Sequence, residues 1–254
     1  MSKSNGNHKS LVTLTEFIDH FPALTNQETI NNLAEGEKLS LADLTKVTVP
    51  TGGGLAWMVE KLNGQESIKE LTGIILSQAL PRALYASTFE ESGGQEPAVC
   101  LSNDSITGHL NSEALPKGEF PERLVKIGNP TGHCENCPFA QWGTKLKGDG
   151  SFGHGQMCQQ RRVLLFLTPE TSMPLLVSIP PSGLKNIKHY LVELQSVGLK
   201  HWQIVTRIGL MPDKNADGIK FSRPVFILSG VIPQDNWEQI TTYMKDFKAQ
   251  LATT

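Results

Sequence analysis

Cys134 and Cys137 are separated by two residues, and Pro138 follows them directly. This spacing forms a knuckle whose two thiolates can bind one side of a tetrahedral metal ion. The other two cysteines of the chain would complete a four-thiolate site, which closes a long loop and leaves no open coordination position for a substrate. We therefore predict a structural zinc ion held by Cys100, Cys134, Cys137 and Cys158.

Three other interpretations of these cysteines remain open. His133 or His154 could replace one cysteine as a ligand, and an iron–sulfur cluster would use the same four thiolates. Cys100 follows the apolar residues Ala98 and Val99, so it could instead be a buried strand residue that binds no metal. Zinc is the favoured interpretation.

Aromatic rings alternate with positive charges around and after the knuckle. An unpaired nucleic-acid strand requires both, because every base has a π-face and every linkage a phosphate. We predict contacts with single-stranded nucleic acid through two rings and six basic side chains. These are Phe139, Trp142, Lys145, Lys147, Arg161, Arg162, Lys185 and Lys188. The alternative is that the two rings pack as a small core beside the metal, and we expect Trp57 and Tyr85 to be core residues.

The charge of the chain is unevenly distributed. The formal net charge is −2, but residues 121–223 carry 13 basic and 7 acidic side chains. Residues 1–99 carry 7 basic and 12 acidic ones. The middle of the chain is therefore the part best suited to a polyanion.

No catalytic constellation is present in the sequence. It contains no Walker lysine motif, no His-Glu-x-x-His and no Gly-x-Ser-x-Gly elbow. Asp104 could serve a metal-dependent nuclease, but no carboxylate cluster accompanies it and a turn-forming role is favoured. We predict a protein that is not an enzyme.

The elements that must position these residues follow from periodicity. Residues 1–45 are predicted to be an N-terminal arm with short helices, and residues 46–254 an OB-like β-barrel. Period-2 runs flank the turn Gly52–Gly54, and Pro81 interrupts the next apolar stretch. The Gly- and Pro-rich segment at about 100–160 lacks periodicity, so we expect the metal to order it as an inserted zinc lobe. Residues 234–251 are expected to form a C-terminal helix.

This order of elements is strands, a metal-dependent insert, a strand hairpin, a helix and a final strand pair. An OB barrel of five strands carries its helix between the third and fourth strands, so the order fits that fold. The predicted class is α+β, mainly β, with an OB-like barrel, an inserted zinc lobe and flanking helices. Sandwich and other mixed arrangements fit the same order.

The composition agrees with a folded, soluble chain. The 254 residues are 39% hydrophobic and 19% charged, which excludes global disorder. No apolar run reaches the roughly 18 residues of a membrane span, and the first residues lack the apolar region of a secretory signal. We expect a cytoplasmic protein without a membrane partner, in whose reducing compartment the cysteines stay thiols or metal ligands.

The chain resembles a group of proteins encoded by phages and integrative elements, over roughly residues 50–230. The residues that carry this resemblance are Gly52-Gly-Gly-Leu-Ala-Trp57, Leu71-Thr-Gly-Ile-Ile75, Cys100-Leu-Ser-Asn-Asp104-x3-Gly108, Gly132-His-Cys134-x2-Cys137-Pro138 with Gly143, Cys158, and Leu175-x6-Ser182-x-Leu184-Lys185. The resemblance implies that Cys100 is a metal ligand.

The chain is also similar, more weakly, to the zinc-bearing single-stranded DNA-binding protein of T-even phages, which combines an OB barrel with a metal lobe. This similarity implies a groove between barrel and lobe, to which residues 139–162 could contribute one wall. The cysteine order differs, and the C-terminal tail lacks the acidic tip that recruits replication proteins.

We therefore predict a non-catalytic single-stranded nucleic-acid-binding protein, with DNA favoured over RNA, that acts in phage or mobile-element replication or recombination. Proteins of those processes are expected as further partners, and the oligomeric state is left open. The alternative is an adaptor or transcription regulator that binds other proteins through its metal lobe and acidic N-terminal part.

Overall fold

The computed structural model describes residues 21–25, 32–61, 63–87, 96–115, 120–147, 149–214, 218 and 220–251. Two compact units divide the chain. Unit 1 consists of Met1–Ser77, Leu164–Ser178 and Ser182–Thr254, and unit 2 of Gln78–Val163 and Ile179–Pro181. Unit 2 is thus inserted into the sequence of unit 1, and it contains the segment expected to form a zinc lobe.

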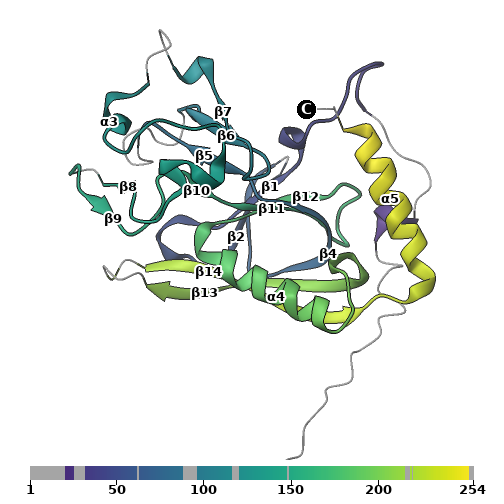
Figure 1. The fold of residues 1–254 in the computed structure, drawn as a ribbon. Coiled ribbons are helices and arrows are strands. Elements are labelled where there is room, and N and C mark those ends of the chain that lie inside the picture. The colour runs from purple at the N-terminus through teal and green to yellow at the C-terminus, as the bar shows by residue number, and fades with distance from the viewer. Residues whose placement is uncertain are drawn as a thin grey trace, which may run out of the picture. The chain divides into compact units, whose positions relative to one another are not determined.

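Unit 1 is built on an eight-stranded sheet that curls into a half-barrel (Figure 1). The strands run in the order β14-β13-β4-β11-β12-β1-β2-β3. Their bounds are β1 Lys46–Thr48, β2 Trp57–Lys61, β3 Gly64–Ile68, β4 Leu71–Ala79, β11 Arg162–Leu167, β12 Leu175–Ile179, β13 Ile204–Lys214 and β14 Lys220–Val231. The predicted mixed class, mainly β, is confirmed.

The five-stranded OB-like barrel is not confirmed. The sheet has eight strands, with β14 and β3 at the two ends of its order. β1 pairs with β12 in parallel, Val47 opposite Val177, although the two strands lie far apart in the sequence. The expected turn between β1 and β2 is present, and Gly52 and Gly53 both take positive φ there.

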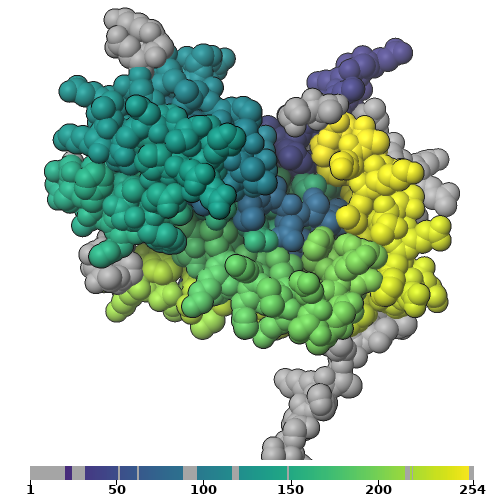
Figure 2. All heavy atoms as spheres, in the orientation of Figure 1, coloured from purple at the N-terminus to yellow at the C-terminus, as the bar shows by residue number. Residues whose placement is uncertain are grey.

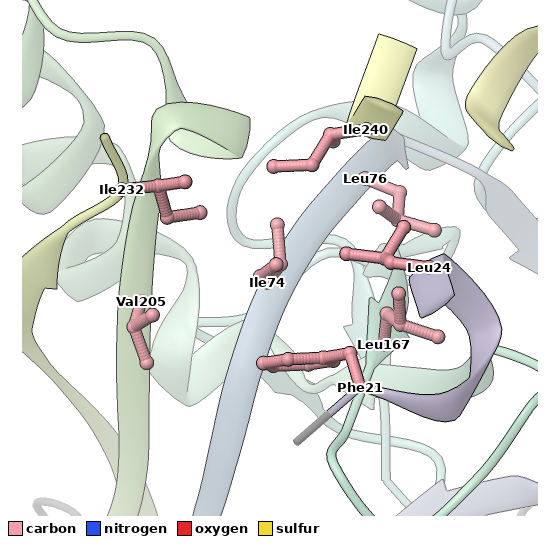
Figure 3. Close-up of a cluster of buried hydrophobic side chains, with 8 residues drawn as sticks. All are labelled: Phe21, Leu24, Ile74, Leu76, Leu167, Val205, Ile232 and Ile240. Carbon is pink, nitrogen blue, oxygen red and sulfur yellow. The ribbon is translucent and has the colours of Figure 1, made fainter. Parts of the chain in front are cut away.

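Helices cover both faces of the sheet. The C-terminal helix α5 (Trp237–Gln250) places Ile240 in a buried cluster with Ile74 and Val205 (Figure 3). Helix α4 (Leu184–Ser196) reaches the opposite face, because its Tyr190 hydroxyl bonds to the hydroxyl of Thr206, the residue after Val205. Both helices contribute to the surface seen in Figure 2. The burial of Gly73–Leu76 in β4 follows from this double covering.

The middle of the predicted N-terminal arm packs into unit 1. Helix α1 (Pro22–Thr25) is short, and Phe21 and Leu24 belong to the same buried cluster as α5. Trp57 is fully buried in unit 1, as predicted, and its indole N–H donates to the Ile208 carbonyl at 3.2 Å. Residues 1–20 and 26–31 of the arm lie outside the described residues.

Unit 2 contains a four-stranded sheet in the order β10-β5-β6-β7 and the hairpin β8–β9. Its elements are β5 Arg82–Leu84, β6 Cys100–Ser102, β7 His109–Leu110, α3 Glu122–Val125, β8 Lys145–Leu146, β9 Phe152–Gly153 and β10 Gln159–Gln160. A small core of buried residues holds the unit together: Leu84, Val99, Leu115, Leu124, Phe139 and Cys158. Pro81 separates β4 from β5, as the sequence predicts.

Across the described residues, no helix has both the length and the apolar character needed to cross a membrane.

Candidate metal centre and nucleic-acid interface

The knuckle forms one turn of 3-10 helix, Cys134–Asn136. The Cys137 N–H donates to the Cys134 carbonyl at 3.4 Å, and the Ala140 N–H donates to the Cys137 carbonyl at 3.0 Å. Side chains three residues apart eclipse one another in a 3-10 helix. The local fold therefore turns the thiols of Cys134 and Cys137 toward the same side.

Cys100 reaches the knuckle through the β6–β7 hairpin. The Cys134 N–H donates to the Ile106 carbonyl at 2.9 Å, and the Gly108 N–H donates to the Gly132 carbonyl at 2.8 Å. A β-carbon at Gly108 would lie 3.1 Å from the Sγ of Cys100 and 3.8 Å from the Sγ of Cys134. Both sulfurs thus border the space that a side chain at Gly108 would occupy, and the absence of that side chain leaves room for them.

Asp104 shapes the connection between β6 and β7. Its carboxylate accepts hydrogen bonds from the N–H groups of Ile106 and Thr107 at 2.8 and 2.9 Å, and from the Ser102 hydroxyl at 3.0 Å. These bonds hold the pKa of Asp104 below its usual value. The favoured turn-forming role of Asp104 agrees with this geometry, and the turn presents the Ile106 carbonyl to the knuckle.

Cys158 completes the set from the segment before β10. Its N–H donates to the Phe139 carbonyl at 2.8 Å, which ties it to the residues just after the knuckle. Its own carbonyl accepts a bond from Arg82 Nη1 at 3.4 Å. Cys158 is buried, and it belongs to the core of unit 2.

All four cysteines line one small cavity of about 20 Å³ in unit 2. They are free thiols. Burial raises the pKa of Cys158 to about 12; Arg82 opposes this rise, and the three other thiols add to it. Burial likewise raises the pKa of Cys100, with further contributions from Cys134 and Cys137. Burial therefore favours the neutral form of both thiols.

The donor set fits a single soft divalent ion. In the described part of the chain, no three His, Cys, Asp or Glu side chains already form a metal-holding group, so the thiols would have to rotate toward the cavity to close a shell. Four thiolates are the ligand set of a structural zinc ion, and an iron–sulfur cluster would use the same four residues. His133 also lines the cavity, whereas His154 does not.

Trp142 and two predicted lysines lie on or beside the β8–β9 hairpin of unit 2 (Figure 1). Trp142 is 77% exposed, and Lys145 and Lys147 are exposed on either side of the buried Leu146. The carbon stem of each lysine passes close to a glycine of the returning chain. Lys147 would lie 3.3 Å from a β-carbon at Gly153, and Lys145 would lie 3.2 Å from one at Gly155. The hairpin thus supports both cations and leaves one large ring open to solvent.

The predicted stacking role of Phe139 is wrong. Phe139 is fully buried in the core of unit 2, where its ring lies 5.6 Å from that of Phe120. A side chain with no exposed face cannot stack on a base. The alternative of a small core beside the cysteines is correct for Phe139, but it does not hold for the exposed Trp142.

The remaining predicted cations do not form one cluster. Arg161 is exposed in unit 2, whereas Arg162 is half-buried and bonded to the Gln78 side chain. Burial lowers the pKa of Arg162, and its Nε atom is buried without a hydrogen-bond partner among the described residues. Lys185 and Lys188 are exposed on α4, which belongs to unit 1.

Three further residues of unit 2, none of which was predicted to contact nucleic acid, carry rings or a cation. Phe152 is 52% exposed on β9, and Tyr85, which we expected in the core, is 44% exposed. Arg123 bonds through Nη2 to the Lys147 carbonyl at 3.4 Å and adds a cation beside the hairpin. The sequence contains a signal for the exposure of Tyr85. Successive side chains of an extended segment point to opposite faces, and the neighbouring Leu84 points into the core.

Comparisons of the chain with protein families, curated proteins and solved structures found no match.

Proposed function

We propose that this chain is a non-catalytic single-stranded nucleic-acid-binding protein in which unit 2 is a zinc lobe. The observation that carries the proposal is the β8–β9 hairpin. An exposed indole stands there with two exposed lysines whose stems are supported by the opposite strand. Exposed rings beside cations are the elements of single-strand binding that does not depend on sequence.

In this proposal Trp142 stacks on a base, and Lys145, Lys147 and Arg161 contact phosphates. Phe152 replaces Phe139 as the second ring, because it is exposed and lies on the strand that pairs with β8. Lys185 and Lys188 remain proposed contacts from unit 1. The OB-like barrel is not required, since the rings and most of the cations belong to unit 2.

The zinc ion would give the hairpin a rigid base. Cys137 directly precedes the 3-10 turn Pro138–Ala140 that leads to Trp142, and Cys158 follows the strand β9 that closes the hairpin. Holding both cysteines on one ion would therefore fix both ends of the segment that carries the ring and the lysines. We further propose that this activity serves phage or mobile-element replication or recombination.

Fluorescence anisotropy with a labelled single-stranded oligonucleotide across a salt series tests the proposal. We expect Trp142→Ala to weaken binding by about 5- to 150-fold, since one stacked base contributes about 1–3 kcal/mol. The double variant K145A/K147A should reduce the slope of log affinity against log salt by about 1.4. K245A/K248A is the matched control, because it removes two exposed cations from α5 and changes the net charge equally.

Two results would contradict the proposal. One is the lack of binding at about 50 mM salt, and the other is binding that does not depend on salt. Equal effects of the two double variants would show that only net charge matters. Metal analysis of the purified protein by mass spectrometry, with single Cys→Ser variants, tests the zinc lobe separately.

A protein-binding adaptor is the second candidate function, and one feature of unit 2 favours it. The β6–β7 hairpin exposes three aliphatic side chains: Leu101 at 45%, Ile106 at 67% and Leu110 at 55%. Exposed apolar groups on a short hairpin are suited to a protein partner. A pull-down with and without nuclease separates the two functions, because an adaptor keeps its partner after the nucleic acid is digested.

A further inference from the structure

Arg82 belongs to the sheet of unit 2 and lines the same cavity as the four cysteines. It is the first residue of β5, directly opposite Ser102 on β6 and Gln160 on β10. Its Nη1 donates to the Cys158 carbonyl at 3.4 Å. Its Nε atom is buried and has no hydrogen-bond partner among the described residues. A buried N–H donor without an acceptor is costly, and this one belongs to a residue that lines the same cavity as the four cysteines.

The charge of a four-thiolate centre requires compensation. A divalent ion with four thiolates carries two net negative charges, and burying such a group away from water is unfavourable unless a cation accompanies it. Arg82 has the only permanent charge among the described residues that line the cavity. An arginine side chain keeps its charge at all relevant pH values, so it can supply this compensation.

We propose that Arg82 is the charge-balancing residue of the metal centre. Its guanidinium group reduces the net charge of the metal centre from two negative charges to one. Its buried Nε–H donates a hydrogen bond to one of the metal-bound sulfurs. Arg82 is thus a positioning residue outside the ligand shell: it sets the affinity for the ion without binding it. This inference rests on the proposed zinc lobe.

Zinc competition against a chromophoric chelator measures the effect under reducing conditions. Arg82→Met keeps most of the apolar stem, and we expect it to lower zinc affinity about 10- to 100-fold, as is typical when a partner of a metal ligand is removed. Arg82→Lys keeps the charge and should recover part of that loss. Lys126→Ala is the matched control, because it removes one exposed cation of unit 2 that does not line the cavity.

Cobalt substitution supplies a readout that a general loss of stability would not reproduce. The thiolate-to-cobalt absorption band should shift in Arg82→Met, because the sulfur that accepts the Nε–H bond becomes a better electron donor without it. Equal zinc affinities and equal cobalt spectra for Arg82→Met and Lys126→Ala would overturn the role of Arg82 and leave the metal centre intact. A wild-type protein that binds neither zinc nor cobalt would refute the metal lobe and this inference together.

Discussion

Replacing Phe139 and Trp142 separately by alanine tests the division between core and surface in unit 2. Phe139 is fully buried among core side chains, so its truncation leaves a cavity and should cost about 3–5 kcal/mol of unfolding free energy. Trp142 lies three residues later but is 77% exposed. Its truncation should change the unfolding free energy by no more than about 0.5 kcal/mol.

Equilibrium unfolding in urea, followed by far-UV circular dichroism under reducing conditions, measures both changes. With a urea dependence of about 1–3 kcal/mol per molar, Phe139→Ala should lower the midpoint by at least about 1 M, and Trp142→Ala by less than about 0.5 M. The same two proteins should rank in the opposite order in oligonucleotide binding once each is shown to be folded.

Similar midpoints for the two variants would refute this reasoning. They would mean that Phe139 does not hold the core of unit 2 together, and its predicted role as a stacking ring would again be open. A large loss of stability in Trp142→Ala would remove the exposed ring on which the proposed function depends.

Four further substitutions test the packing and the titrating groups. A β-carbon at Gly73 would lie 2.1 Å from a backbone oxygen of β11, whereas the atom nearest to a β-carbon at Gly209 would be 3.6 Å away. Gly73→Ala should therefore sharply reduce soluble yield and thermal stability. Gly209→Ala should change neither. Asp104→Ala should lower the melting temperature at pH 7. Hydrogen bonds lower the pKa of the Asp104 carboxyl in the folded state. The difference in melting temperature between variant and wild type should therefore vanish as the pH falls through that lowered pKa. Burial lowers the pKa of His201, whose neutral ring donates from Nδ1 to the Ile75 carbonyl at 2.8 Å. Protonation therefore opposes folding, so the wild type should lose stability as the pH falls below about 6.5, and thermal melts of His201→Gln should lack this component.

The proposed metal ligands could be predicted from the sequence because part of the site is local. Two cysteines three residues apart meet on one side of a short turn in any chain that forms the knuckle. Cys100 and Cys158 were added because their residue type matches and, for Cys100, because the resemblance to phage and integrative-element proteins implies a ligand there. Their arrival at the same cavity depends on the β6–β7 hairpin and on the bond between Cys158 and Phe139, and nothing in the sequence shows these contacts.

The stacking ring could not be predicted in the same way. Phe139 and Trp142 are both aromatic, both follow the knuckle and lie in a segment without periodicity. Which of them faces the core depends on α3 and the preceding loop, which supply Leu124 and Phe120 from elsewhere in the chain. The role of Arg82 could not be predicted for the same reason, since its strand is close to the cysteines only in the folded unit.

By itself, the sequence determined that the chain is mixed and mainly β, that β1 and β2 are joined by a glycine turn, and that a helix lies near the C-terminus. These features depend on periodicity and on neighbouring residues. Only the tertiary structure decided that the sheet has eight strands, that β1 lies parallel to the distant β12, and that Phe139 is buried while Trp142 is exposed. Strand partners and core contacts are made between segments far apart in the chain, so no local pattern specifies them.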